Sequence, residues 1–312
     1  MISSLFGKTK PINFIIVLTL LCVLFVVVRI FNININIEPS HILFVILTAI
    51  ILIMSIFAIN FIIIRNKLTE TNTFAILFFS LLVFAFSRVL LDNNAIICNF
   101  FVLLALRRLI SIKSLKSVKF KIFDAVLWIL VASLFYKWAL LYLLLVVVAI
   151  YFYDPRNIKN WMVIPIASTT FFLIAYAILI LIDKQDFLET HYLAAFNFNM
   201  EFYLDWSNSS KLLVLFIITS FTGIWAFLKI GKSGVGRIIT MRLIAISFFI
   251  ALVVVFLETS ETVFPVLLTF FPAIIFVTNY LEALKKPRIR EAILVIAILG
   301  TVSILISDLL LS

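Results

Sequence analysis

The chain has little charge for its length. Only 13% of its 312 residues are charged, whereas 65% are hydrophobic, and the mean hydropathy is +1.26. Soluble domains are about half apolar and about a quarter charged. A water-soluble fold could not hide this much apolar surface, so the sequence predicts a protein whose solvent is lipid.

The sequence also lacks the residues from which metal, redox and nucleotide sites are built. It has two cysteines, Cys22 and Cys98, both inside apolar runs, and two histidines, with no CxxC and no Cys/His cluster. We interpret the thiols as small buried hydrophobic groups and expect no metal and no cofactor. No Walker loop, HExxH or GxSxG motif is present. Few carboxylates lie within the apolar runs, which argues against an ion-coupled transporter.

What the chain does have is a series of apolar runs separated by short polar segments. They predict an all-α, polytopic membrane helix bundle with about 11 transmembrane helices, forming a single integral membrane domain over residues 1–312. The first run follows Lys8 and Lys10 and ends at Arg29, so we expect it to be an uncleaved span. The runs are residues 12–30, 42–64, 74–91, 95–106, 122–136, 138–153, 161–182, 212–228, 238–257, 263–280 and 292–306.

The stretch from Arg107 to Asp154 organises the chain. A basic seam is followed by the apolar run 122–153, which Lys137 divides into halves of 15 and 16 residues. Each half would reach only ~22 Å as a helix, short of the ~30 Å hydrocarbon core. Either both halves span a thinned membrane, or they form a re-entrant hairpin in a bundle of nine other spans. The seam consists of Arg107, Arg108, Lys113, Lys116, Lys119 and Lys121.

The distribution of charge predicts the orientation. With a crossing at each run, 20 of the 25 lysines and arginines fall on the side of the N-terminus, and ten of the 15 carboxylates fall on the other side. Basic loops face the cytoplasm in bacterial inner-membrane proteins, so we expect the N-terminus inside and the C-terminus outside. The net charge of +10 then indicates contact with anionic lipid at the cytoplasmic loops and no nucleic acid.

Two segments between the runs carry mixed apolar and polar patterns. Residues 111–121 alternate apolar side chains with lysines, which is typical of a stretch held against anionic lipid, or of a dock for a soluble partner. Residues 186–206 approximate one aromatic-rich helical face. We expect an amphipathic helix there, either lying on the outer leaflet or covering a cavity between the spans.

The few cations on the predicted outer side are the candidate site. Charged side chains at the ends of spans often only reach towards water, and this remains the simpler interpretation. Alternatively they bind an anionic headgroup, because arginine can hold phosphate oxygens in pairs, while nearby acids and bases act on the headgroup. The candidate substrate-binding residues are Arg29, Arg88 and Lys137; the candidate catalytic residues are Glu38, His41 and Asp92, with Glu201 and Asp205 as further carboxylates.

Several short motifs resemble an uncharacterised family of polytopic bacterial inner-membrane proteins. They are LLALRRLIS (103–111), KIFDA (121–125), ASLFYKW (132–138), KTKPIN (8–13) and NKLT (66–69). The resemblance implies membrane location and the threading given above. Some relatives are labelled as carotene-cleaving oxygenases, but such a non-haem iron site needs several histidines and only His41 and His191 exist here.

The many spans, outer carboxylates and outer amphipathic segment are also similar to integral-membrane glycosyltransferases that use polyprenyl-linked sugars, by analogy of fold alone. The sequence therefore leaves two functions open. The first is an enzyme or carrier for a lipid-linked anion at the outer face, with polyprenyl phosphate as ligand. The second is a non-catalytic subunit or scaffold of an inner-membrane complex, whose basic inner face binds a partner.

Overall fold

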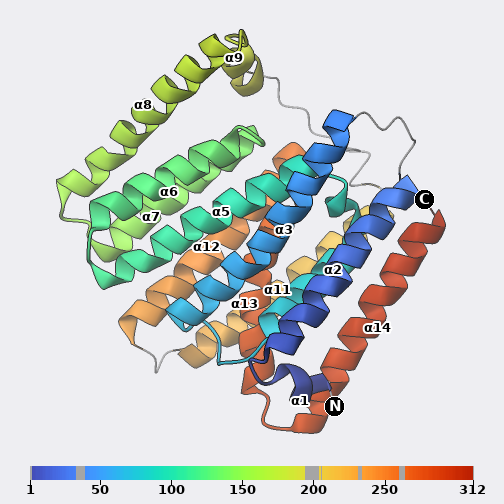
Figure 1. The fold of residues 1–312 in the computed structure, drawn as a ribbon. Helices are drawn as coiled ribbons and strands as arrows, with labels where there is room; N and C mark the ends of the chain where they lie inside the picture. Colours follow the sequence, from blue (N-terminus) through green and yellow to red (C-terminus); the bar gives the residue numbers. More distant parts are fainter. Residues whose placement is uncertain are drawn as a thin grey trace.

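The computed structural model describes residues 2–32, 39–193, 204, 206–230, 234–259 and 264–311, and no strand occurs among them. The predicted all-α class is confirmed for this part of the chain (Figure 1). In chain order the helices are α1 Ile2–Phe6, α2 Pro11–Asn32, α3 Pro39–Asn66, α4 Phe74–Ala85, η1 Ser87–Leu90, α5 Asn93–Ser111, η2 Ile112–Ser114, α6 Val118–Ser133, η3 Lys137–Tyr142, α7 Leu143–Tyr153, α8 Ile158–Leu181, α9 Phe187–Tyr192, α11 Trp206–Ile230, α12 Val235–Glu258, α13 Leu267–Ala283 and α14 Pro287–Leu311.

Seven of the described helices are long and apolar enough to cross a membrane: α2, α3, α5, α8, α11, α12 and α14. They indicate a membrane-embedded protein. The apolar segments of α4, η3–α7 and α13 are shorter. Each of the predicted apolar runs falls on a helix, but the count of about eleven spans stays a prediction because several of these helices are short.

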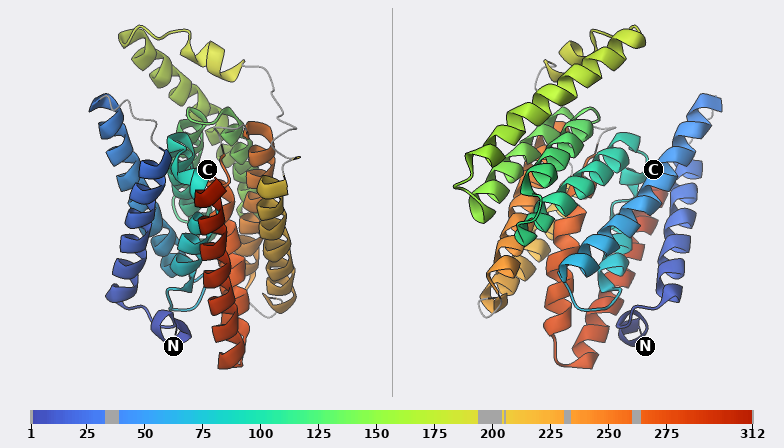
Figure 2. Two further views of the ribbon diagram at one scale, coloured as in Figure 1. Left: turned by 90° about the vertical axis from the view of Figure 1, so that its right-hand side faces the viewer. Right: turned by 60° about the vertical axis from the view of Figure 1, so that its left-hand side comes forward.

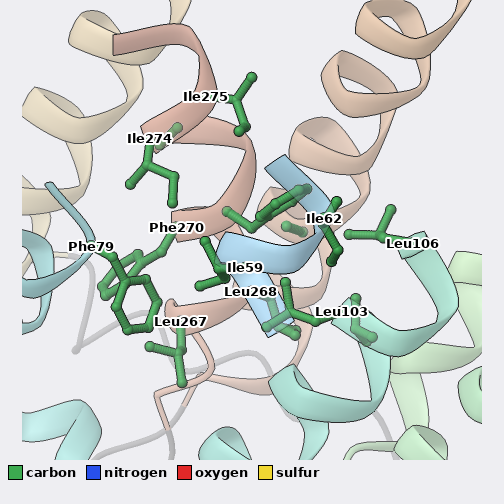
Figure 3. Close-up of a cluster of buried hydrophobic side chains, with 14 of the residues drawn as sticks. Ile59, Ile62, Phe79, Leu103, Leu106, Leu267, Leu268, Phe270, Ile274 and Ile275 are labelled. Atoms are coloured by element: carbon green, nitrogen blue, oxygen red, sulfur yellow. The ribbon is translucent and has the colours of Figure 1, made fainter. Parts of the chain in front are cut away.

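The core is built around two of the short helices. Most residues of α4 and α13 are buried, and the two helices pack against each other. Phe79 and Phe270 meet edge to face, with 6.1 Å between ring centroids. A helix that is apolar all round can be buried on every side. Ile59 and Ile62 of α3 and Leu103 and Leu106 of α5 complete the cluster shown in Figure 3.

The helix α8 lies along α6 at the edge of the bundle, with the short α9 at its far end (Figures 1 and 2). Most of its apolar side chains are exposed, including Leu173 at 67% and Leu181 at 83%. Soluble monomers rarely expose apolar patches of this extent. The exposed apolar side chains of α8 are therefore suited to contact with lipid.

The helix ends gather at two opposite ends of the bundle. At one, which we call the basic end, Lys113 donates to the carbonyl of Asn66 at 3.2 Å. At the other, the tip end, Arg29 donates to Asn93 at 2.5 Å and the Trp138 N–H donates to Glu258 at 3.2 Å. Figure 1 places the start of the chain and its last helix end at opposite ends of the molecule.

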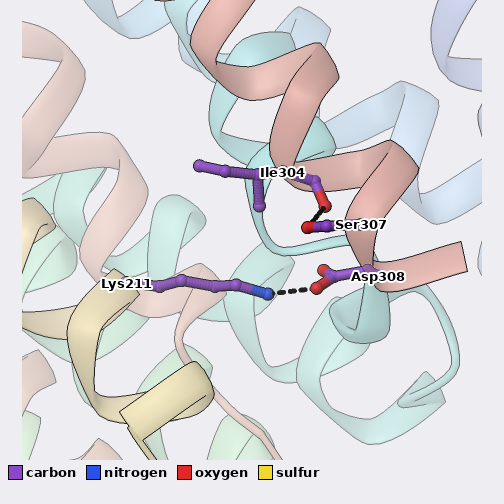
Figure 4. Close-up of polar contacts among 4 residues, drawn as sticks. All are labelled: Lys211, Ile304, Ser307 and Asp308. Carbon is purple, nitrogen blue, oxygen red and sulfur yellow. Dashed lines mark hydrogen bonds and ion pairs between the residues drawn. The ribbon is translucent and has the colours of Figure 1, made fainter. Parts of the chain in front are cut away.

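An ion pair joins α11 to α14 near the tip end. Lys211 Nζ and Asp308 Oδ1 are 2.5 Å apart, and their side chains are only 17% and 10% exposed (Figure 4). The Ser307 hydroxyl donates to the carbonyl of Ile304 at 2.7 Å on the same helix turn. Removing one member of such a pair would leave a buried unpaired charge, so the pair fixes the two helices together.

Two predicted segments differ in detail from the structure. Residues 111–121 do not form one helix, because Leu115 and Ser117 adopt left-handed conformations (φ 53° and 51°) between η2 and α6. Leu115 and Phe120 are 61% and 75% exposed there, as a stretch at a membrane surface would be. Of the predicted amphipathic helix 186–206, the described part forms only the short α9 and the start of α11; residues 194–203 and 205 lie outside the described residues.

Candidate functional site

Asp92 is the centre of a buried polar cluster at the tip end. Its Oδ1 atom caps α5 by accepting the N–H of Ala95 at 3.0 Å, the usual role of aspartate at the residue before a helix. Its Oδ2 atom accepts the backbone N–H of Phe264 at 3.0 Å and the hydroxyl of Tyr136. The carboxylate therefore connects the start of α5, the break after α6 and the segment before α13.

Tyr136 lies in the non-helical break between α6 and η3. Its backbone is extended, with φ −134° and ψ 111°, which turns the chain and aims the ring inwards. The Tyr136 phenol is buried and donates a hydrogen bond to the Asp92 carboxylate.

Glu258, the last residue of α12, provides the second carboxylate of the cluster. It accepts the Trp138 N–H at 3.2 Å and is close enough to the Lys137 ammonium and to Asp92 to interact with both charges. Glu258 follows the run 238–257 and is one of the ten carboxylates predicted on the outer side, but it is not among the predicted site residues. The available signal was its position, because it ends a span on the same side as the Lys137 break.

Arg29 reaches the same cluster from the end of α2. Its Nη2 donates to Asn93 Oδ1 at 2.5 Å, its guanidinium lies 5.0 Å from the Phe25 ring centroid, and its charge interacts with Asp92. The Arg29 Nε atom is buried and has no hydrogen-bond partner within the described residues. One donor of the guanidinium thus remains unused beside the carboxylate.

Beside this cluster a groove opens between η3–α7 and α8. Its volume is about 470 Å³, within the range of small-molecule sites. The wall is mostly leucine and valine, and its polar groups are the Lys137 ammonium, the Trp138 indole and the Tyr192 hydroxyl. The lining residues are Lys137, Trp138, Leu140, Leu141, Leu143, Leu144, Val147, Ile164 and Tyr192.

The short helix α9 bounds one side of the groove and is tied to the end of α6. The Tyr192 hydroxyl lies 2.7 Å from the Ser133 hydroxyl, and His191 Nε2 lies 2.8 Å from the Ser133 carbonyl oxygen. Phe187 of α9 also lines a second, almost wholly apolar cavity of about 430 Å³ between α6 and α8. Apolar spaces along α8 are the kind that lipid chains fill.

The structure brings some of the predicted site residues together and separates others. Arg29 and Asp92 belong to one cluster, and Lys137 lies beside it in the groove. Arg88 is exposed on η1 and makes no ion pair within the described part of the chain. Glu38, Glu201 and Asp205 lie outside the described residues. The side chain of His41 lies outside them too, although its backbone is part of the first turn of α3. No group of three His, Cys, Asp or Glu residues suited to a metal was found in the described ranges.

The fold and the site together define a polytopic helical membrane protein with a mostly apolar groove next to a buried cluster of carboxylates. Comparison with protein-family models found no match, and comparisons with curated proteins and with solved structures found none either.

Proposed function

We propose that this protein binds a lipid-linked anionic substrate at the outer face of a bacterial inner membrane, and that it transfers a sugar from or to a polyprenyl phosphate. The observation that carries the proposal is the groove between η3–α7 and α8. It combines a wall of aliphatic side chains with a single lysine among its lining residues. An isoprenoid chain fits such a wall, and its phosphate can bind the ammonium of Lys137 through a charge-assisted hydrogen bond.

The neighbouring carboxylates supply the acid and base groups for transfer. Both oxygens of Asp92 accept hydrogen bonds from neighbouring segments, so we assign it a positioning role. Glu258 is partly exposed and, among the described residues, accepts one hydrogen bond, from the Trp138 N–H. For transfer from the polyprenyl phosphate, we propose that Glu258 is the general base that takes the proton from an acceptor hydroxyl as its oxygen attacks the anomeric carbon of the sugar. The bond from that carbon to the phosphate oxygen breaks, and Lys137 holds the departing polyprenyl phosphate.

The proposal includes a topology of eleven crossings, with the N-terminus in the cytoplasm and the C-terminus outside. The 20:5 division of cations supports it. The hairpin formed by α6 and α7 contacts both ends of the bundle: Tyr136 donates to Asp92 at the tip end, and the Tyr153 and Thr240 hydroxyls lie 3.4 Å apart at the start of α12. This supports two crossings rather than a re-entrant loop.

Replacing Lys137 by Met tests the ligand role, because it keeps side-chain length and removes the charge. We expect the variant to lose at least about tenfold in affinity for polyprenyl phosphate, since a charge-assisted contact contributes about that factor or more. Lys184→Met is the matched control, since Lys184 is exposed, lies between α8 and α9, and is not among the groove residues. Binding is measured on purified protein by native mass spectrometry with a polyprenyl phosphate.

Equal binding by Lys137→Met and the control would contradict the proposal. Loss of membrane abundance without loss of binding would instead identify Lys137 as a structural partner of Glu258.

The second candidate function is a scaffold in a membrane complex. The observation that favours it is the helix α8 at the edge of the bundle, most of whose apolar side chains are exposed. A partner helix could cover this face as well as lipid could. This alternative predicts that a specific membrane protein co-purifies in mild detergent and is lost when large residues replace Ile166 and Ile174, which are exposed on α8.

A further inference from the structure

A second cleft lies at the basic end, the opposite end of the bundle from the groove. It is bounded by the end of α11, the start of α12, the end of α13 and the loop between α3 and α4, all in the lower part of Figure 1. Its volume is about 470 Å³. Its lining includes Lys67, Glu70, Trp225, Lys229, Arg237, Asn279 and Glu282.

The walls of this cleft are held in place by hydrogen bonds across long sequence distances. Asn279 Nδ2 donates to the carbonyl of Leu68 at 3.1 Å. The Glu282 carboxylate accepts the N–H of Glu70, with both oxygens at 3.0 Å, and the amide of Asn72 at 2.6 Å. Lys67 adopts a left-handed conformation, with φ 52°, where the chain leaves α3. The loop is therefore fixed against α13, and Lys67 is set at the edge of the cleft.

Three cations from three different elements line this cleft. Lys67, Lys229 and Arg237 make no ion pair within the described residues. Lys229 lies 4.8 Å from the centroid of the Trp225 ring, and Arg237 makes one weak hydrogen bond, to Asn279 at 3.4 Å. Most of the five donors of the Arg237 guanidinium are thus unused.

The cleft contains two carboxylates against these three cations. Glu282 interacts electrostatically with Arg237, but its oxygens are already taken up by Glu70 N–H and Asn72. Glu70 is exposed on the loop. Positive charge therefore remains in excess in the cleft, and Lys113, which interacts with Lys67, adds to it. A bound anion would relieve this repulsion.

We propose that this cleft binds a phosphate-bearing anion through Arg237, Lys229 and Lys67. Arginine suits the role because its planar fork binds two phosphate oxygens at once, and lysine adds point charge. Trp225 forms an aromatic wall, stacked edge to face on Tyr280 at 5.1 Å between centroids, beside the phosphate. The phosphate belongs either to a phospholipid headgroup or to a free phosphate. The site is separate from the tip-end groove and does not depend on the function proposed there.

The test compares two probes on the full-length protein in neutral detergent: phosphatidylglycerol and inorganic phosphate, each titrated by native mass spectrometry. The cleft variant is Arg237→Gln with Lys229→Gln. The control variant is Lys285→Gln with Lys286→Gln, which removes the same charge from exposed residues of the α13–α14 loop that are not part of the cleft lining. We expect the cleft variant to weaken saturable binding at least about tenfold and the control to leave it within about twofold.

Binding of the lipid alone would identify the headgroup as the source, and binding of both probes would identify the phosphate group itself. The proposal is overturned if neither probe binds saturably, or if both variants weaken binding equally, which is the behaviour of general surface charge. Because all three cations are exposed, the variants should fold; Lys67→Gln alone, checked by gel filtration, repeats the test with one change.

Discussion

At the scale of single residues, the two carboxylates of the tip end differ in what their oxygens do. Asp92 is buried, and its carboxylate accepts hydrogen bonds from Ala95, Tyr136 and Phe264. Both of its oxygens therefore bind neighbouring segments of the chain. Glu258 is half-buried and accepts one hydrogen bond from the part of the chain that the structure describes. A group that acts as acid or base must reach its substrate, which favours Glu258.

Replacing Asp92 by Ala should therefore destabilise the protein. The change removes the cap of α5 and leaves the Tyr136 hydroxyl and the Phe264 N–H without their acceptor, a loss of about 3 kcal/mol in the free energy of unfolding. Tyr136→Phe is the matched control. It should lower the free energy of unfolding by only about 1 kcal/mol, because it removes one hydrogen-bond donor while the Asp92 carboxylate still accepts the N–H groups of Ala95 and Phe264. Thermal unfolding in detergent measures both; equal midpoints for Asp92→Ala and the unchanged protein would refute this role.

Asp92 also shows what sequence could and could not predict at this scale. The turn Asp92-Asn93-Asn94 was visible in the sequence, and an aspartate before an apolar run indicates a helix start. Its bond to the N–H of Phe264 was not, since the two residues are 172 positions apart. The proximity of Glu258 to Lys137 was missed for the same reason.

At the scale of elements, hydrophobicity located the helices but not all of their ends. The break at Lys137 was predicted from a charge inside an apolar run, and the structure has α6 ending at Ser133 and η3 beginning at Lys137. The end of α4 at Ala85 was not predicted, because residues 86–91 contain no proline or glycine and, apart from Ser87 and Arg88, continue the apolar run. Tertiary packing alone turns this segment into η1.

The burial of α4 and α13 was likewise beyond the sequence. Their composition differs little from that of α2 or α3, which are largely exposed, yet the short helices form the core. In lipid, apolar content no longer separates interior from surface, since acyl chains are as apolar as leucine. Which helix is central depends on helix–helix contacts that no single segment encodes.

At the scale of the whole molecule, the proposed threading makes a prediction about the C-terminus. Alkaline phosphatase fused after Ser312 should be active, because that enzyme folds only outside the cytoplasm and the charge division places this end there. The same enzyme fused after Ser114, in the basic seam, is the control and should be inactive. An inactive C-terminal fusion at normal expression, together with an active fusion after Ser114, would show the opposite orientation. The groove would then lie on the cytoplasmic side.

The two polar regions lie at opposite ends of the molecule, and their chemistry differs. The tip end combines carboxylates, a tyrosine and one lysine beside an apolar groove, whereas the basic end combines three cations around an open cleft. Reaction chemistry fits the first and anchoring to a phosphate fits the second. A protein with this arrangement would be held at one membrane face and act at the other.

The measurement that tests the account most directly is a structure determined in native membrane, without detergent. We predict continuous lipid-like density in the groove along Leu140, Leu144 and Val147, ending in a compact headgroup within hydrogen-bond reach of Lys137. A groove without such density, or one filled by a helix of another protein, would contradict the proposed function and would favour the scaffold.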